Sequence, residues 1–163
     1  MLLLEATAVN YKVQDRLLFK IDSLKIHRHQ RIGIIGRNGS GKTTLLNILA
    51  GNILLEKSDI DLSSSIKLVP QLKRSEVEKS GGEITQMYLQ EAFNESPGIL
   101  MLDEPTTHLD AERIEWLERK LLDSQRTLLV VSHDRTFLDS LCTDVWEIDN
   151  GTVTEYKGNY HDY

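Results

Sequence analysis

The chain has 163 residues, of which 19 are basic and 25 acidic, and a formal net charge of −6. This length suits one domain with a substantial core, and the acidic balance gives no support for a nucleic-acid-binding patch on this domain itself. No run of 18 apolar residues is present, so the sequence contains no candidate membrane helix. Cys142 is the single cysteine and Met1–Glu5 lacks the basic start of a secretory signal, so we expect a cytoplasmic protein.

The N-terminal part of the chain predicts a β-region. Leu2–Ala8 and Leu17–Ile26 are both typical of strands. Tyr11 lies between them and could stack on the adenine ring of a nucleotide. A lone tyrosine more often serves packing, so both interpretations stay open.

The next segment carries a phosphate-loop pattern, G-x-x-x-x-G-K-[ST], at residues 36–43. Arg31–Ile35 predicts a buried strand before it, and Lys42–Ala50 a helix after it that ends at Gly51. The glycines let several backbone N–H groups face one anion, while the helix start favours negative charge. Lys42 supplies charge for the outer phosphates and the Thr43 hydroxyl can ligate Mg²⁺. The residues expected to touch the nucleotide here are Gly36, Arg37, Asn38, Gly39, Ser40, Gly41, Lys42, Thr43 and Thr44.

The middle of the chain is less regular. Residues 58–65 are polar and predict a loop, Ile66–Val69 predicts a short strand ending at Pro70, and residues 73–79 are charged and expected to be exposed. Gln71 could reach a metal ion or an attacking water, although a glutamine before a charged stretch more often reflects loop polarity alone. Glu83–Phe93 predicts a helix with Ile84, Met87, Tyr88 and Ala92 on one face, broken by Ser96-Pro97-Gly98.

Two acidic residues follow the most apolar run of the chain. Ile99–Leu102 predicts a central parallel strand, and Asp103-Glu104 come directly after it. Ligands of α/β sheets bind beyond the carboxyl ends of the strands, so these carboxylates point to a site rather than to a solvated loop. Asp103 would hold Mg²⁺, directly or through water, and Glu104 would orient and polarise the attacking water.

The C-terminal third continues the alternation of helices and strands. Asp110 can cap a helix to Leu122 whose inward residues are Ile114, Leu117 and Leu121. Thr127–Val131 predicts a second buried strand, and His133 at its end either contacts the γ-phosphate or is a capping or packed histidine. A helix over residues 134–141 and a hairpin with Asn150-Gly151 at its tight turn complete the chain.

Strands alternating with helices predict an α/β domain with a mostly parallel sheet and right-handed crossovers. With its motifs in this order, the chain resembles an ATP-binding cassette (ABC) ATPase over essentially all 163 residues. The resemblance implies a P-loop ABC-type fold with an N-terminal antiparallel β-region, and it implies ATP and Mg²⁺ as ligands. It also assigns roles, which follow the order of the family's motifs. They are the aromatic loop (Tyr11), glutamine loop and Mg²⁺ ligand (Gln71), signature (Ser80, Gly81, Gly82, Glu83), Mg²⁺-binding Asp103, catalytic Glu104, D-loop (Leu109-Asp110) and switch His133.

In this family the signature contacts the γ-phosphate that another cassette holds. The resemblance therefore implies a second cassette as a partner, either in the same chain or in a homodimer, and weak ATPase activity for the domain alone. Residues 103–110 and 155–163 are similar to motifs of the ABC-F branch, whose members carry two cassettes and no membrane segment. Residues 69–73 and 79–83 are most similar to the Vga-type antibiotic-resistance members, which act on the ribosome. The chain is then expected to be the first cassette of a longer protein.

Three departures from the family pattern matter. Lys79 stands where the signature usually has Leu, and Glu83 where transporters usually have Gln. Ser80 follows Gln71 by only nine positions, where most cassettes insert a helical subdomain, so residues 72–93 predict a strongly reduced helical region. That subdomain forms much of a transporter's groove for its membrane partner, so its reduction disfavours the alternative, a transporter ATPase. A binding module without hydrolysis is disfavoured because Glu104 and His133 are both present.

Overall fold

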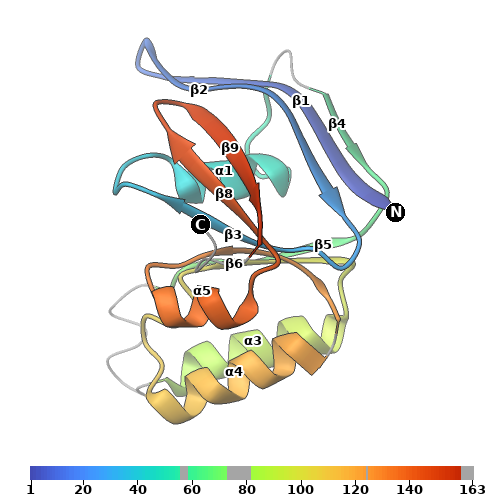
Figure 1. The fold of residues 1–163 in the computed structure, drawn as a ribbon, viewed down its shortest axis with the longest axis vertical. Helices are drawn as coiled ribbons and strands as arrows, with labels where there is room; N and C mark the ends of the chain where they lie inside the picture. Colours follow the sequence, from blue (N-terminus) through green and yellow to red (C-terminus); the bar gives the residue numbers. More distant parts are fainter. Residues whose placement is uncertain (56–58, 73–81, 124, 159–163) are drawn as a thin grey trace.

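The computed structural model describes residues 1–55, 59–72, 82–123 and 125–158. The elements form two sheets and a layer of helices (Figure 1). In chain order they are β1 (Leu2–Val13), β2 (Arg16–His27), β3 (Arg31–Gly36), α1 (Lys42–Leu49), β4 (Asp59–Leu62), β5 (Ile66–Val69), α3 (Glu83–Glu95), β6 (Ile99–Asp103), α4 (Ala111–Asp123), β7 (Thr127–Val131), α5 (Arg135–Leu141), β8 (Asp144–Asp149) and β9 (Thr152–Lys157).

A six-stranded sheet in the order β5-β6-β7-β3-β8-β9 forms the centre of the domain. Its strands run parallel except β9, which pairs antiparallel with β8. Every residue of β6 and β7 is buried, because α3, α4 and α5 cover one face and α1 with the N-terminal sheet covers the other (Figure 1). Continuous apolar runs are what strands covered on both faces require. The predicted mostly parallel α/β fold is therefore confirmed.

The N-terminal sheet has the antiparallel order β2-β1-β4 and corrects one prediction. Residues 58–65 were expected to be a loop, yet Asp59–Leu62 forms β4 and pairs with Leu4–Thr7 of β1. β4 is a mostly exposed edge strand in which only Ile60 packs against the core. The polar composition of β4 carries no local strand signal. The segment becomes a strand because it pairs with residues of β1 that lie more than fifty positions earlier in the chain.

Helix α3 corrects a second prediction. It turns Thr85, Leu89, Ala92 and Phe93 inward, whereas the predicted face had Ile84, Met87, Tyr88 and Ala92. Met87 is 52% exposed and Tyr88 is 42% exposed. The apolar residues of α3 cover a wide arc, and the docking of Leu89 and Phe93 against α4 and the sheet decides which part of that arc is buried.

Two further expectations agree with the structure. Leu117 and Leu121 of α4 are fully buried and Ile114 packs beside them. The hairpin turn has positive φ at both Asn150 (49°) and Gly151 (79°), the geometry that favours this residue pair. Of the predicted reduced helical region at residues 72–93, the structure describes α3, while residues 73–81 lie outside the described residues.

Candidate active site

Three neighbouring parallel strands bring the predicted site residues to one edge of the sheet. β7 lies between β6 and β3, with Asp103 in register with Val131 and Ile34 in register with the same residue. The loops after β3, β6 and β7 therefore leave the sheet side by side, on the left in Figure 1. They carry the phosphate loop, the acidic pair and His133, as expected for a crevice at the carboxyl ends of parallel strands.

The phosphate loop depends on two glycines in the left-handed region, Gly39 at φ +80° and Gly41 at φ +97°. A Cβ on Gly41 would lie 2.6 Å from Cζ of Phe19, so a side chain at this position would clash unless Phe19 shifted. The amide of Leu45 donates to the Gly41 carbonyl (2.8 Å) as α1 begins. The N–H groups of the first turn have no carbonyl partner within the helix, which suits them to an anion.

Lys42 lies inside this loop and is 9% exposed. Its Nζ donates to the carbonyl oxygens of Gly36 (2.7 Å) and Arg37 (3.2 Å). Burial lowers the pKa of the Lys42 ammonium, and the nearby carboxylates of Glu104 and Asp103 oppose that shift. An ammonium group has three N–H donors, so one remains for a phosphate oxygen.

Thr43 and Asp103 form the part of the site that fits a divalent cation. The Thr43 hydroxyl donates to Oδ2 of Asp103 (2.8 Å), and Oδ1 of Asp103 is buried without a hydrogen-bond partner among the described residues. Burial raises the pKa of Asp103, while the Thr43 hydrogen bond and the Lys42 charge lower it. Hydroxyl and carboxylate oxygens are ligands that Mg²⁺ prefers, and a cation there would compensate the buried carboxylate. Bound Mg²⁺ would neutralise phosphate charge.

Glu104 lies beside His133 across the ends of β6 and β7. Its backbone is left-handed (φ 49°), and its amide donates to the Val131 carbonyl (2.8 Å). His133 Nε2 lies 3.2 Å from Oε1 of Glu104, and the His133 amide donates weakly to Oε2 (3.4 Å). Burial raises the pKa of Glu104, whereas the charge and amide of His133 lower it. The two predicted catalytic side chains are thus placed together.

The backbone around His133 is fixed by the start of α5. The amide of Asp134 donates to the Ser132 hydroxyl (3.0 Å), and the Asp134 carboxylate caps the helix by accepting from the Phe137 amide (3.0 Å). Since α5 is anchored in this way, the loop that carries His133 has little freedom at its C-terminal side. The His133 ring itself is 61% exposed, which leaves it accessible to a ligand in the crevice.

A depression of about 720 Å³ joins these groups. Gln71 lines it together with Lys42, Thr43, Asp103, Glu104 and His133. The tip of the β1–β2 hairpin also lines it, through Val13, Gln14, Arg16 and Leu18. Local sequence gave no sign of these four residues, because only the fold brings the hairpin tip over the phosphate loop.

Tyr11 does not line this depression. It is half-buried against the core, in register with Phe19 of β2, and Val13 of the same strand lies nearer the loop. An adenine contact by Tyr11 stays a prediction. Ser80 and Gly81 lie outside the described residues. Gly82 is described and has no room for a side chain, because a Cβ would lie 3.0 Å from the His108 carbonyl oxygen.

Comparison with known proteins identifies the family. A family model described as ABC transporter matches residues 19–75. The ribosome protection protein VmlR of Bacillus subtilis is 34% identical, over 96% of this chain and 33% of its own length. The erythromycin resistance ATP-binding protein MsrA of Staphylococcus epidermidis is 33% identical, over 95% of this chain and 36% of its own length. The chain belongs to the ATP-binding cassette ATPases. These relatives confirm the resemblance to the ABC-F branch, and the cassette spans about a third of their length.

The fold agrees with this identification. A nucleotide-free ATP-binding cassette from an ABC transporter superposes with a TM-score of 0.84 at 15% identity, covering 97% of this cassette and 92% of that chain. The cbiO1 protein of Clostridium perfringens superposes with a TM-score of 0.75 at 20% identity. At these identities the likeness establishes the fold alone. In the part of the cassette that the structure describes, no helix is long and apolar enough to cross a membrane.

Proposed function

We propose that this cassette binds and hydrolyses ATP as a domain of an ABC-F protein that acts on the ribosome in the cytoplasm. The observation that carries the proposal is the convergence of Lys42, Asp103, Glu104 and His133 on one depression beside the phosphate loop. Phosphoryl transfer to water needs mostly positioning and neutralisation of charge, and these residues supply both.

Each residue then has a defined task. The backbone of residues 36–44 and the Lys42 ammonium hold the phosphates, and Thr43, Asp103 and Gln71 would hold Mg²⁺. Glu104 orients and polarises the water that attacks the γ-phosphorus. His133 contacts the γ-phosphate and, at 3.2 Å from Glu104, holds that carboxylate in place. A base positioned in this way typically contributes 10²–10⁴-fold to a rate.

The proposed reaction requires a second cassette. In the family arrangement, the signature at Ser80, Gly81 and Gly82 faces the phosphates that the partner cassette holds. The signature of the partner faces the phosphates that this cassette holds. The tight packing of Gly82 against the loop that leads into α4 is consistent with a fixed position for the end of the signature. The cassette alone therefore lacks one side of its own site and is expected to hydrolyse ATP slowly.

The names of VmlR and MsrA support a biological role in ribosome protection and antibiotic resistance. The alternative is the ATPase of a transporter, which the solved neighbours support. We favour the ABC-F role because two relatives above 30% identity, VmlR and MsrA, carry ribosome or resistance names, whereas the transporter structures share 15–20% identity and so speak for the fold.

Sedimentation of the full-length gene product from a cell lysate tests this role. Glu104→Gln should retain ATP and accumulate the closed form, so the protein should move with ribosomes when ATP is present. The matched variant Glu104→Gln with Lys42→Ala should lose that movement because it no longer holds ATP. Movement with the membrane fraction instead would support the transporter alternative.

A further inference from the structure

A second hollow lies between the outer faces of α3 and α4, remote from the phosphate loop. Its volume is about 580 Å³. It is lined by Gln90, Phe93 and Asn94 of α3, by Trp116, Arg119, Lys120 and Asp123 of α4, and by Arg126. We call it the α3–α4 groove. It shares no residue with the depression at the active site.

The centre of the groove is a cluster of one arginine and two aromatic rings that contact one another. The Arg126 guanidinium lies 5.2 Å from the centre of the Phe93 ring, and its Nη2 donates to the Phe93 carbonyl (3.1 Å). Trp116 meets Phe93 edge to face, with ring centres 5.9 Å apart and planes at 66°. Phe93 is buried and Trp116 is half-buried, so the arginine and the indole are the groups that a ligand can reach. Because the cluster is preformed, a ligand would not have to order it.

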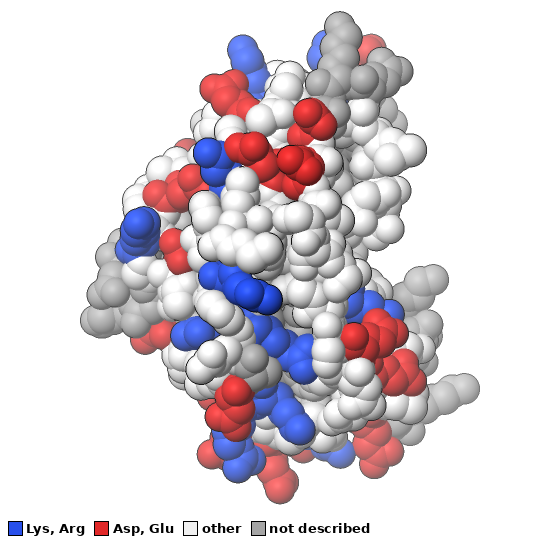
Figure 2. Space-filling model, turned by 90° about the vertical axis from the view of Figure 1, so that its right-hand side faces the viewer, with Lys and Arg blue, Asp and Glu red and all other residues white. Residues whose placement is uncertain are grey.

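The charge of the groove is opposite to that of the cassette. Arg119, Lys120 and Arg126 outweigh Asp123 among its lining residues, while the whole chain carries −6. Figure 2 faces the end of the domain on which the helical layer stops, and basic side chains form a band through the middle of its lower half, with acidic ones to either side. Such a local basic band attracts polyanions whatever the net charge is.

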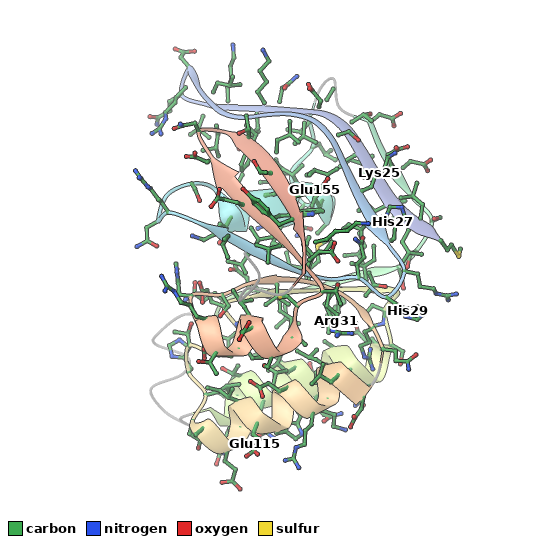
Figure 3. The ribbon with its side chains drawn as sticks, viewed as in Figure 1. Lys25, His27, His29, Arg31, Glu115 and Glu155 are labelled. Carbon is green, nitrogen blue, oxygen red and sulfur yellow. The ribbon has the colours of Figure 1, made fainter. Side chains whose placement is uncertain are left out.

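The turn between β2 and β3 continues this basic surface. His29 reaches the start of β7, where its amide donates to the Thr127 hydroxyl (2.8 Å) and its Nδ1 lies 2.7 Å from the Gln125 carbonyl. These contacts place the turn, which also carries the exposed Arg28, against residues 125–127. Figure 3 shows His29 and Arg31 on this side of the molecule, between the sheets and the helical layer.

We infer that the α3–α4 groove and the adjacent turn form a docking surface for single-stranded RNA. Arg28, Arg119 and Lys120 would contact phosphates, and the exposed part of Trp116 would stack on a base. The amides of Gln90 and Asn94, which hydrogen-bond to each other (3.1 Å), offer their remaining donors and acceptors to base edges. The inference rests on the proposed function in one respect, namely that a ribosome would supply the RNA.

Fluorescence anisotropy with a labelled oligouridylate of about 12 nucleotides tests the inference on the full chain. Arg119→Glu with Lys120→Glu should weaken binding about tenfold and reduce the slope of log K against log salt by about 1.4. The control is Lys12→Glu with Lys20→Glu, which makes the same charge change on exposed residues of β1 and β2 and should leave the affinity within about twofold. Equal weakening by both pairs would overturn the inference. Loss of binding in Lys42→Ala would also overturn it, since the RNA would then occupy the phosphate loop.

Tryptophan fluorescence gives a second readout that does not depend on charge. The chain has two tryptophans, and Trp146 is 2% exposed, so quenching by RNA should come from Trp116 and disappear in Trp116→Phe. Polyglutamate of equal length is the competing ligand. Suppose that polyglutamate binds as tightly as the oligouridylate and is weakened equally by Arg119→Glu with Lys120→Glu. In that case the surface binds an acidic protein segment and the RNA assignment is wrong.

The outcomes separate the two proposals. In one case the Glu104→Gln protein cofractionates with ribosomes, but RNA binding is unchanged by Arg119→Glu with Lys120→Glu. This result would support the proposed function and overturn the docking surface. In the other case RNA binding depends on the groove, but the protein does not cofractionate with ribosomes. This result would support the docking surface and overturn the proposed function.

Discussion

Glu104 and His133 meet across the ends of β6 and β7, with His133 Nε2 3.2 Å from Glu104 Oε1. The contact depends on the left-handed backbone of Glu104, whose amide extends the ladder to Val131. A non-glycine residue in this conformation is strained by about 1–3 kcal/mol, which the ladder hydrogen bond and the packed strand ends hold in place. In this conformation the carboxylate lies beside the histidine, and both residues line the active-site depression.

This pairing predicts the pH dependence of hydrolysis. Burial raises the pKa of Glu104, so the rate should begin to fall at a higher pH than it would for an ordinary carboxyl, as the base becomes protonated. The His133 charge opposes the shift, so His133→Ala should move this acid limb to still higher pH, besides lowering the rate. The pH–rate profile of the cassette with its partner cassette measures both. An acid limb that stays in place in His133→Ala would show that His133 does not act on Glu104.

Lys42 is predicted to be essential for nucleotide affinity. Its buried ammonium lies among the loop carbonyls with one donor left for a phosphate, so Lys42→Ala should weaken ATP binding at least about 100-fold. Isothermal titration of the cassette with ATP measures the loss. Lys20→Ala, on the exposed side of β2, removes the same charge and should leave the affinity unchanged. Retained affinity in Lys42→Ala would contradict the phosphate-loop assignment.

Gly41 and Gly39 form a matched pair for the backbone of the loop. Both have positive φ, but nothing lies within 4 Å of a Cβ on Gly39, whereas a Cβ on Gly41 meets Phe19. Gly39→Ala should therefore reduce the free energy of unfolding by about 1 kcal/mol, the usual penalty of a left-handed alanine. Gly41→Ala should reduce it by a further 1–3 kcal/mol, roughly the cost of overpacking. Urea unfolding measures both, and equal losses would show that Phe19 gives way freely.

Asp103 is predicted to destabilise the ligand-free cassette. Burial raises its pKa in the folded state, so the ionised carboxylate opposes folding at pH values above its unfolded pKa, and this effect fades as the pH falls. At neutral pH, Asp103→Asn should therefore raise the melting temperature without ligand, because the amide oxygen can still accept from Thr43. The same variant should lose the additional stabilisation by Mg²⁺ with ATP.

Thermal melts with and without Mg²⁺ and ATP measure these two effects. Asp22→Asn, on an exposed position of β2, is the control and should change neither value. A lower melting temperature for ligand-free Asp103→Asn would show that the carboxylate is stabilising without a cation, contrary to the prediction.

Much of the fold could be predicted from the sequence because its signals are local. The apolar runs of β6 and β7 are too continuous for anything but strands covered on both faces. The Asn150-Gly151 turn requires positive φ at two successive residues, and its sequence supplies them. The phosphate loop similarly combines glycines with a lysine at a spacing that only one backbone geometry explains.

The active site could be predicted where strand order alone places a residue. Lys42, Thr43, Asp103, Glu104 and His133 each follow or lie close to the carboxyl end of a parallel strand, so adjacency of β3, β6 and β7 is sufficient to gather them. Gln71 follows β5 at the same edge. The hairpin-tip residues could not be found in this way, because they belong to the other sheet and reach the crevice only through packing.

By itself, then, the sequence determined the elements whose conformation depends on neighbouring residues, and the motif that binds phosphate. The tertiary structure alone decided the pairing of β4 with β1, the inward face of α3, and the 3.2 Å contact of His133 with Glu104. It also placed the turn that carries Arg28 against residues 125–127, beside the basic residues of the groove. The physical reason is the range of the interactions. Backbone preferences and periodicity act over a few residues, whereas ladder pairing, burial and charge clustering join residues that lie far apart in the chain.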